Sequence, residues 1–312
     1  MSFFLSLEEP MRTQDFKDTA HVVHEMGRSI ESYLIKYLFN QVKSQEVIKE
    51  LARFQNKDGG FGHGLEPDCW NPHSSPIQTQ FAMGYFRLLE FDPYHKVIKK
   101  MMKYLEKTYD NKIRKWHLLL PSNNDFPHAP WWSYKESNED FNPSGSIAGF
   151  IIKYGKKKSK VYQYACEVLD DAMDDISNDK LSKEPHELSN LVDLFDDAKE
   201  VFNSDEGFIK SRQKLIDLIG ETIEKDHKKW FTDYVTKPSV LIHSKNSIGY
   251  SKYQDLLHLE FKESLKYQNQ LKLWPVTWSW TDYLDVFEEV KEIWACIIAL
   301  KYLYLMKDDI KE

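Results

Sequence analysis

This chain of 312 residues has neither an excess of basic residues nor paired cysteines. Its formal net charge is −7, so it lacks the basic face that binding to a phosphate backbone requires, and nucleic acid is not expected as a partner. Its three cysteines are odd in number and widely spaced, at Cys69, Cys166 and Cys296. Such spacing predicts neither a disulfide framework nor a CxxC metal pair.

Long apolar runs are missing too. No run approaches the roughly 18 residues that a membrane-spanning helix needs. The opening stretch MSFFLSLEEPMRTQDF also lacks the basic region and the longer apolar core of a signal peptide. We therefore expect a soluble, cytoplasmic protein without a transmembrane segment, whose oligomeric state the sequence does not indicate.

Aromatic residues, in contrast, are abundant. They make up 14% of the chain and include nine tryptophans, within a hydrophobic content of 41% that is typical of a globular protein. Aromatic side chains in excess either build a large core or line a concave site. The length allows one large domain or two ordinary ones, and we expect a single domain over residues 1–312, with an irregular N-terminal segment over 1–13.

The hydrophobic pattern is helical throughout, without a convincing run of alternating strand residues. Ser75 followed by Pro76 predicts a helix start, with the helix reaching about Phe91. Asn142 and Pro143 predict the same start before a helix that ends near Gly155. Further helices are expected over 18–39, 44–55, 94–108, 159–176, 185–203, 207–225, 252–268 and 286–306. The expected fold class is all-α.

A weak internal repeat runs through these helices. Gln55 is followed six residues later by Phe61, and Gln268 six residues later by Trp274. A glutamine side chain can bond backbone groups freed at a helix end, a glycine permits a left-handed turn, and the aromatic residue packs under the next helix. Trp116 and Trp230 also follow a helix and a short polar turn. The repeat therefore predicts helix pairs that close into a ring, because a single pair cannot bury its own apolar stripes.

The stretch LARFQNKDGGFG resembles the glutamine–glycine–aromatic repeat of the terpenoid cyclase and protein prenyltransferase superfamily. YQNQLKLWPVTWSW is similar, with Lys272 where that repeat has glycine. The resemblance implies an α/α toroid, here an incomplete or small barrel of about five to six helix pairs, in which outer helices surround inner helices around a cavity. It also implies an enzyme that acts on an isoprenoid or another apolar small molecule.

The motifs of that superfamily's known chemistries are mostly missing. The chain has no DxDD motif, and DLFDDA, with Asp193, Asp196 and Asp197, has the wrong spacing. LDDAMDDISND spells DDxxD at Asp170, Asp171 and Asp174, but an acidic run on a helix indicates a solvated outer face. No zinc-protease, serine-hydrolase or phosphate-loop signature is present.

A metal site stays open at this stage. Asp68 and Cys69 are adjacent, whereas the zinc-binding prenyltransferases separate the corresponding pair by one residue. A zinc site from these two residues and a histidine, or another divalent metal site, is therefore an alternative rather than the main prediction. The cofactor stays unknown.

Three segments before helices gather carboxylates, histidines and tryptophans. In a ring of helix pairs such segments meet at one mouth of the cavity, and loops longer than about 12 residues tend to be functional. The expected catalytic residues are His63, Glu66, Asp68, Asp125 and His128. The expected substrate-binding residues are Trp70, Asn71, Gln78, Asn123, Asn124, Trp131, Trp132, Trp278 and Trp280. Trp274 belongs to the third segment as well.

Three functions compete for this set of residues. In an isoprenoid-directed enzyme, aromatic walls would stabilise a carbocation and Asp68, Glu66 or Asp125 would donate or accept the proton. In a carbohydrate-directed glycosidase or lyase, tryptophan faces would stack on sugar rings and Asp68 and Asp125 would form the carboxylate pair. A binding or scaffold protein would have kept the ring and lost catalysis. Aromatic cavity walls favour the first function, a polar groove with paired carboxylates the second and a filled core the third.

Overall fold

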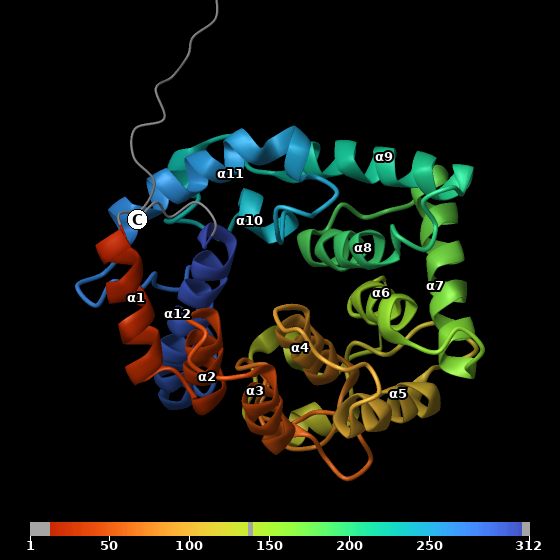
Figure 1. Ribbon diagram of the computed structural model, residues 1–312, viewed down its shortest axis with the longest axis horizontal. Coiled ribbons are helices and arrows are strands. Elements are labelled where there is room, and N and C mark those ends of the chain that lie inside the picture. The colour runs from red at the N-terminus through yellow and green to blue at the C-terminus, as the bar shows by residue number, and fades with distance from the viewer. Residues whose placement is uncertain (1–12, 137–139, 308–312) are drawn as a thin grey trace, which may run out of the picture.

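The computed structural model describes residues 13–136 and 140–307, and these residues form an all-helical fold (Figure 1). The α-helices are α1 (Thr13–Met26), α2 (Ser29–Leu38), α3 (Ser44–Leu51), α4 (Pro76–Arg87), α5 (Lys96–Thr108), α6 (Ser144–Tyr154), α7 (Lys160–Ser177), α8 (Pro185–Ala198), α9 (Glu206–Thr222), α10 (Pro238–Leu241), α11 (Tyr250–Ser264) and α12 (Leu284–Met306). Short 3-10 helices are η1 (Ala52–Phe54), η2 (Pro121–Asp125), η3 (Pro130–Trp132), η4 (His227–Lys229) and η5 (Leu265–Tyr267). Within the described ranges no helix is long and apolar enough to cross a bilayer.

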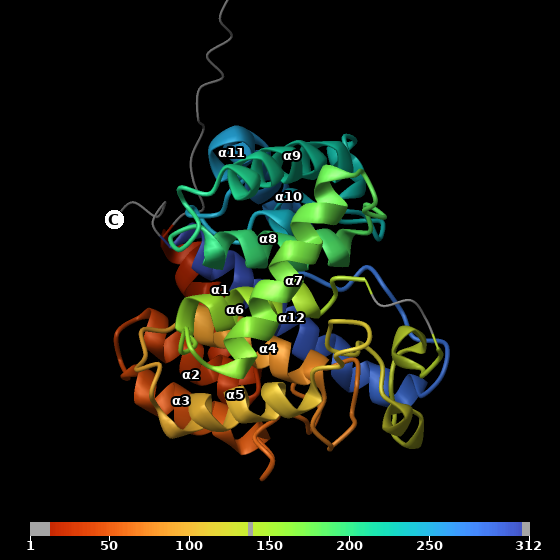
Figure 2. The same ribbon diagram turned by 90° about the vertical axis from the view of Figure 1, so that its right-hand side faces the viewer.

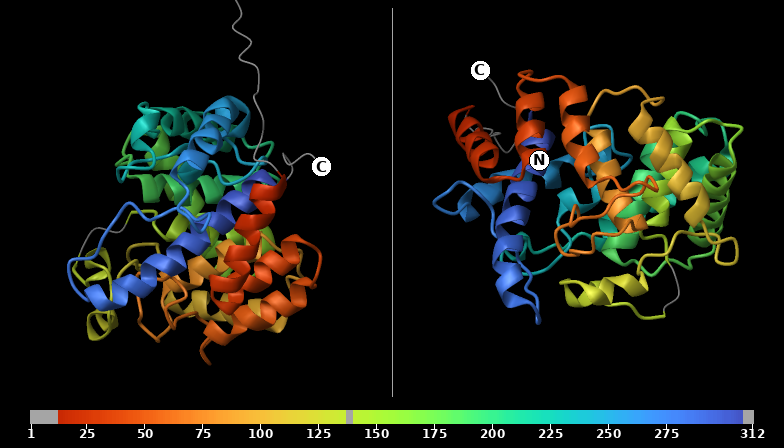
Figure 3. Two further views of the ribbon diagram at one scale, coloured as in Figure 1. Left: turned by 90° about the vertical axis from the view of Figure 1, so that its left-hand side faces the viewer. Right: turned by 90° about the horizontal axis from the view of Figure 1, so that it is seen from below.

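The helices alternate along the chain between the edge and the middle of the molecule. In Figure 1, α5, α7, α9 and α11 lie at the edge, while α4, α6, α8 and α10 lie nearer the centre. Neighbouring helices of the same layer are in contact, from α4 to α6, α8 and α10, and from α5 to α7 and α9. At the other side, α12 packs against α1 and α2, so that the two ends of the described chain meet (Figure 3).

The two glutamines of the repeat make equivalent contacts. The side-chain amide of Gln55 donates to the backbone carbonyls of Gly59 and of Val97, the latter in α5, both at 2.9 Å. The amide of Gln268 donates to the carbonyl of Lys272 at 3.0 Å and to the hydroxyl of Thr19 in α1 at 3.2 Å. Each glutamine therefore ties the end of one outer helix to the next outer helix, and the second of these links joins the last helices to the first.

The turn conformation confirms the role expected of the repeat. Gly59 has a φ of 103°, which an L-residue adopts only with strain, and Lys272 adopts a left-handed φ of 60° at the corresponding position. The aromatic residues that follow are buried to 2% exposure or less at Phe61, Trp116, Trp230 and Trp274. The indole nitrogens of the three tryptophans donate to the carbonyls of Leu105, Glu224 and Ser264, at or just beyond the end of a preceding helix.

The apolar residues form two clusters. The larger is built between the helix layers and contains most of the core. A smaller cluster lies under the connecting loops and the first turns of α12, and its buried members are Cys69, Ile77, Leu119, Ala129, Trp132, Trp280, Phe287 and Val290. A second core of this kind fixes loops that would otherwise have little to pack against.

The helix expected over 18–39 is wrong in detail, because two helices occupy this stretch. They are separated at Gly27 and Arg28, where Arg28 is extended with a φ of −59° and a ψ of 162°. A Cβ at Gly27 would lie 2.6 Å from the carbonyl oxygen of Val23, which explains the glycine. The break turns the Arg28 side chain toward the loop that contains the carboxylates.

The predicted start at Ser75 is confirmed, since its hydroxyl accepts from the backbone N–H of Gln78 at 3.2 Å. The start at Asn142 is wrong: Pro143 is the cap position of α6, no side chain caps it, and the Asn142 oxygen accepts instead from Asn190 at 3.1 Å. The α4 helix ends at Arg87 rather than near Phe91, and α8 ends at Ala198 rather than at 203. Helix α10 was not expected. Of the expected irregular segment 1–13, all but Thr13 lies outside the described residues, and Thr13 begins α1.

Candidate functional site

The first two loop segments expected to form the site lie side by side. The backbone N–H of Ala129 donates to the carbonyl of Asp68 at 2.8 Å, and that of Trp70 donates to the carbonyl of Pro127 at 2.9 Å. The segment before α12 reaches the same place, since Trp280 bonds Asp68. Figure 2 shows the loop near residue 130 beside the chain that leads into α12. The sequence prediction that three separated segments meet is thus in agreement with the fold.

The half-buried Arg28 and the buried Gln78 hold the loop that carries the carboxylates. Arg28 donates to the carbonyls of Gly64 and Leu65 at 2.8 and 3.1 Å. Gln78, expected to bind substrate, bonds two points of the loop. Its side-chain oxygen accepts from the backbone N–H of Glu66 at 2.8 Å, and its side-chain nitrogen donates to the carbonyl of Cys69 at 2.6 Å. Both residues fix the path of the backbone.

Asp68 is the residue of this loop whose environment is most typical of a catalytic acid or base. It is 3% exposed, and burial raises the pKa of its carboxyl group to about 6, against the effect of the nearby tryptophans Trp280, Trp294 and Trp278. The indole N–H of Trp280 donates to Oδ1 at 2.9 Å. A carboxyl group with a pKa near neutrality can both donate and accept a proton under ordinary conditions.

Glu66 lies close to Asp68 and is also buried, at 5% exposure. Burial raises the pKa of Glu66 well above its ordinary value, and the charge of Asp68 raises it further. Its Oε2 atom has no hydrogen-bond partner within the described structure. Glu66 is therefore a weaker acid than a free carboxyl group, and Asp68 is the member of the pair that ionises first.

Near this pair, buried indole N–H groups have no acceptor among the described residues. Those of Trp132, Trp278 and Trp294 are shielded from solvent and make no hydrogen bond of acceptable geometry with the described residues. Trp278 and Trp294 are near enough to Asp68 to lower its pKa, and Trp132 does the same for Glu66. The rings of Trp278 and Trp294 meet edge to face, with centroids 5.4 Å apart. Since buried polar groups are rarely left unpaired, this is a place where a bound polar molecule would find partners.

Several residues expected to bind substrate instead fasten the loops to each other. The amide of Asn71 donates to Ser122 and Asn123, and Asn123 donates to the carbonyl of Trp132 at 3.1 Å. The indole of Trp70 donates to the carbonyl of Pro67 at 3.1 Å. The side-chain amides of Asn71 and Asn123 therefore have a structural role, which is to hold the two loops together.

His128, expected to be catalytic, is 8% exposed and has both ring nitrogens engaged. They lie 2.6 Å from the carbonyl of Phe126 and 3.0 Å from the hydroxyl of Ser133. The ring faces Tyr283 with centroids 6.0 Å apart. His128 is thus part of the loop structure beside the carboxylates.

Four other expected residues lie on the outside. His63, with a left-handed φ of 60°, is exposed and bonds Asn56 at 3.0 Å. Asp125 and Asn124 are exposed on η2, and Asn124 accepts from the backbone of Tyr134 at 2.8 Å. Trp131 is 42% exposed. The loops are therefore brought together, but these four side chains lie at the surface, whereas Asp68 is buried.

The alternatives involving metals find no supporting geometry. Cys69 is buried and its thiol has a pKa raised by burial to about 12, so it stays protonated. In residues 13–136 and 140–307 no group of three histidine, cysteine or carboxylate side chains could hold a metal ion. On α7, Asp171 pairs with Arg114 at 2.9 Å and Asp174 with Lys180 at 2.8 Å, as expected of a solvated outer helix.

A second group of charged residues joins the inner helices. Arg87 of α4 donates to Asp197 of α8 at 2.8 Å and lies 3.4 Å from Asp193, which also accepts from Ser146 of α6 at 2.6 Å. Lys153 of α6 lies 3.1 Å from Asp197. Burial raises the pKa of Asp193, but the charges of Arg87 and then of His243 outweigh it and hold that pKa well below its usual value. Within this network Asp193 therefore stays ionised.

His243, Ser189 and Asp193 are arranged like the triad of a serine hydrolase, but they cannot perform its chemistry. Its Nε2 lies 3.1 Å from the hydroxyl of Ser189 and its Nδ1 lies 2.8 Å from Asp193. Nε2 also lies 2.9 Å from the carbonyl of Val240, which can only accept. Burial lowers the pKa of His243, but the Asp193 carboxylate raises it overall. With acceptors on both ring nitrogens, His243 is an imidazolium and cannot serve as the base that activates Ser189.

Open space lies between α4 and α12. Gly84 of α4 is exposed, and a Cβ added there would meet no atom within 4 Å. On one side of it Arg87 reaches α6, and on the other Phe81 contacts Trp294 of α12, with ring centroids 5.9 Å apart. We call this open space beside Gly84 the central recess. Trp294 connects it to the carboxylates, since it also lies beside Asp68.

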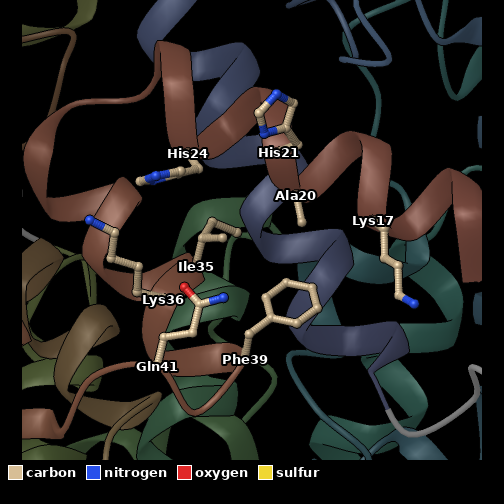
Figure 4. Close-up of a pocket in the computed structure, with 8 residues that line it drawn as sticks. All are labelled: Lys17, Ala20, His21, His24, Ile35, Lys36, Phe39 and Gln41. Carbon is tan, nitrogen blue, oxygen red and sulfur yellow. The ribbon is translucent and has the colours of Figure 1, made fainter.

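A separate hollow of about 230 Å³ lies between α1 and α2 (Figure 4). Its polar lining includes Lys17, His21, His24 and Lys36 and no carboxylate. A shallow hollow of about 420 Å³ lies at the turn after α5, around Asp110 and His117. Neither touches Glu66 or Asp68. We place the chemistry at the carboxylates, because there the pKa values are perturbed and buried donors lack partners.

The residues of the charged network and of the recess were missed by sequence reasoning. Asp193 was considered only as a failed DxDD motif, and Arg87, His243 and Trp294 not at all. Each lies on or beside an inner helix, where a polar face toward a recess has the same periodicity as one toward solvent. The available signal was the acidic cluster DLFDDA inside an otherwise apolar helix. No known protein family, curated protein or solved structure matches the chain.

Proposed function

We propose that the helix layers form an incomplete α/α toroid and that the protein is an enzyme acting by general acid–base catalysis on a carbohydrate. The alternation of inner and outer helices and the closing contact of Gln268 with Thr19 support the toroid. The observation that carries the proposed function is Asp68, a buried carboxyl group with a pKa of about 6 beside Glu66, whose pKa burial also raises. It supplies the acid that cleavage of a glycosidic bond requires.

The strength of the acid decides between the two substrate classes. Protonation of an alkene carbon needs a strong acid, whereas burial makes Asp68 and Glu66 weaker acids than free carboxyl groups. A glycosidic oxygen is more basic, and a donor with a pKa near the working pH transfers a proton to it efficiently. The charged network of the inner helices supports the same choice, since Arg87, Asp193 and Asp197 make this part of the inner layer polar rather than wholly aromatic.

A second carboxylate is available near Asp68. Burial raises the pKa of the Tyr234 phenol, and the charges of Glu184 and Asp68 raise it further, so both carboxylates lie near that ring. Burial raises the pKa of Glu184, but its bond to His186 at 2.7 Å, the charge of that histidine and two backbone hydrogen bonds together lower the pKa below its ordinary value. Two carboxylates whose pKa values are pushed apart have the properties of an acid and a base. In this proposal Asp68 is the acid, Glu184 the base, and Trp278 and Tyr234 the surfaces for a sugar ring.

The test is a turnover assay of the purified protein on aryl glycosides and on neutral and acidic oligosaccharides. Asp68→Asn is expected to lower kcat by roughly 10²- to 10⁴-fold while thermal unfolding stays cooperative. Asp217→Asn, an exposed ion-paired residue on outer α9, is the matched control and should keep full activity. Asp125→Asn tests the pair expected from the sequence, and a loss there equal to that of Asp68→Asn would replace Glu184 by Asp125. Turnover of a prenyl substrate without turnover of any glycoside would overturn the carbohydrate assignment.

A further inference from the structure

The hollow between α1 and α2 has a basic and polar rim. Its polar lining residues are Lys17, His21 and His24 of α1, Lys36 of α2 and Gln41 of the turn after it (Figure 4). No carboxylate lines the hollow. Its volume of about 230 Å³ is below the roughly 300 to 1,000 Å³ of pockets for drug-sized ligands, so it suits one small molecule.

Two residues of this rim have partners that explain them without a ligand. Nδ1 of His24 lies 2.5 Å from the hydroxyl of Ser32, and its Nε2 lies 3.7 Å from a carboxylate oxygen of Glu25. The ammonium of Lys36 lies over the ring of Tyr33, 5.0 Å from its centroid. Both residues also lie in the last turn of a helix, where positive charge is stabilising. The contact with Tyr33 is no hydrogen bond to oxygen, so the N–H donors of Lys36 stay available to an oxygen acceptor.

The other three polar residues of the rim have no such explanation. Within residues 13–136 and 140–307, the amino group of Lys17, the ring of His21 and the side-chain amide of Gln41 make no hydrogen bond or ion pair. Lys17 and His21 are four residues apart and therefore lie on the same face of α1. All three can donate a hydrogen bond, since a histidine ring has at least one N–H in either protonation state.

The other carboxylates of α1 and α2 are engaged outside the hollow. Asp18 accepts from the side chain of Gln14 at 2.6 Å, and Asp15 lies 3.5 Å from a lysine of the segment before α12. Glu31 is buried and pairs with Arg28 at 2.7 Å. The hollow therefore brings the charges of two helices to one space without a counter-charge from either helix in its lining.

The floor of the hollow is apolar. It is formed by Ala20 and Ile35, which are buried, and by the ring of Phe39. Phe39 is held edge to face by Phe16, with ring centroids 5.9 Å apart. Such a floor favours a ligand that has an apolar body as well as a charge.

We propose that this hollow is a binding site for a small organic oxyanion, a carboxylate or a phosphate monoester on an apolar body. The ammonium groups of Lys17 and Lys36 supply the opposite charge, and His21 and Gln41 donate further hydrogen bonds to the oxyanion. The apolar body lies on the floor beside Phe39. Neither Glu66 nor Asp68 lines the hollow, so the site is independent of the proposed carbohydrate chemistry.

The experiment measures binding to the full chain by calorimetry with benzoate, phenyl phosphate, inorganic phosphate and benzyl alcohol. We expect benzoate or phenyl phosphate to bind with an affinity that falls with salt, and the uncharged benzyl alcohol to bind at least roughly tenfold more weakly. Lys17→Met should lower the oxyanion affinity by roughly tenfold, and Lys17→Arg should restore much of it. Lys103→Met, at an exposed position of outer α5, is the matched control and should bind as the wild type does.

An NMR titration locates the bound probe, since the ring signals of His21 and His24 should shift when it is added. Tighter binding of benzoate identifies a carboxylate ligand, and tighter binding of phenyl phosphate identifies a phosphate monoester. Equal affinities of the wild type and Lys17→Met, or no binding of either organic anion, would overturn the site. Inorganic phosphate that binds as tightly as phenyl phosphate would overturn the role of the apolar floor. Asp68→Asn should bind the anion normally, so failure of the proposed acid leaves this result unchanged.

Discussion

The indole nitrogen of Trp280 donates to Oδ1 of Asp68 at 2.9 Å across 212 positions of the chain. This bond joins the loop before α4 to the segment before α12, which lie far apart in the sequence. The pKa of Asp68 therefore depends on a residue that reaches it only when the last helices have packed against the first. The pKa of Asp68 is therefore set by the whole fold and not by its own loop alone.

Removal of this bond should change the pH dependence of activity. Trp280 lowers the pKa of Asp68 by stabilising its ionised form, so Trp280→Phe should raise that pKa above about 6. If protonated Asp68 is the active form, the alkaline limb of the pH–rate profile should move to higher pH. The measurement is kcat/KM against pH for the wild type, Trp280→Phe and the exposed control Trp131→Phe. If the alkaline limb of Trp280→Phe lies at the same pH as that of the wild type, ionisation of Asp68 does not cause this limb.

Asp68 should also make the free energy of unfolding depend on pH. Its pKa is about 6 in the folded protein against an ordinary 3.8, so the folded state holds a proton that the unfolded chain has released. The stability from neutral Asp68 is complete below the ordinary pKa and is lost as the pH rises through about 6. Asp68→Asn cannot ionise, so it should exceed the wild type in stability by up to about 3 kcal/mol at about pH 7.5 and match it near pH 3.5.

Urea unfolding at several pH values measures this difference. Asp196, whose pKa burial also raises to about 6, ionises in both proteins, so its contribution cancels in the comparison. A gap between the two proteins that does not grow between about pH 4 and about pH 7.5 would contradict the pKa assigned to Asp68.

Asp193→Asn should destabilise the protein strongly. The substitution removes the charge that His243 faces at 2.8 Å and leaves Arg87 with Asp197 as its remaining acidic partner. Loss of one member of a buried ion-pair network costs about 3 to 5 kcal/mol, because the partner charges lose their compensation. The pKa of His243 should fall at the same time, which an NMR titration would detect. The exposed pair variant Asp217→Asn should change the free energy of unfolding by less than about 1 kcal/mol, and an equal effect of both would contradict the role of the network.

The helices were largely predictable, because amphipathic periodicity is a local property. The errors have local causes that the pattern does not contain: Arg28 leaves the helical conformation to bind the carbonyls of Gly64 and Leu65, and Asn142 bonds Asn190 instead of capping α6. Such contacts depend on residues that only the folded chain brings near, so the pattern of one segment cannot contain them.

The site was predictable in part. The loop holding Glu66 and Asp68 was identified from its composition, and the meeting of three segments followed from the repeat. The direction of each side chain did not follow, so Asp125 and His63 were included although both are exposed. Arg87 was missed because a charged residue on a helix indicates a polar face without saying whether that face borders solvent or other helices.

Two glycines on inner helices provide the last prediction, because their surroundings are opposite. A Cβ at Gly84 would meet nothing within 4 Å, while one at Gly149 would lie 2.8 Å from the carbonyl oxygen of Asp193 and from the Cα of Leu194. Gly84→Ala should therefore stabilise the protein by about 0.5 to 1 kcal/mol, through the helix propensity of alanine, and Gly149→Ala should destabilise it by forcing α6 away from α8.

Gly84→Leu extends the same test from stability to function. The side chain would enter the central recess, so it should leave the free energy of unfolding within about 1 kcal/mol of the wild type while abolishing substrate binding and turnover. Thermal unfolding and calorimetry on the same preparation separate the two effects. Full turnover in a stable Gly84→Leu protein would mean that the substrate does not use the recess, and the reaction at Asp68 would then have to be approached from outside the ring.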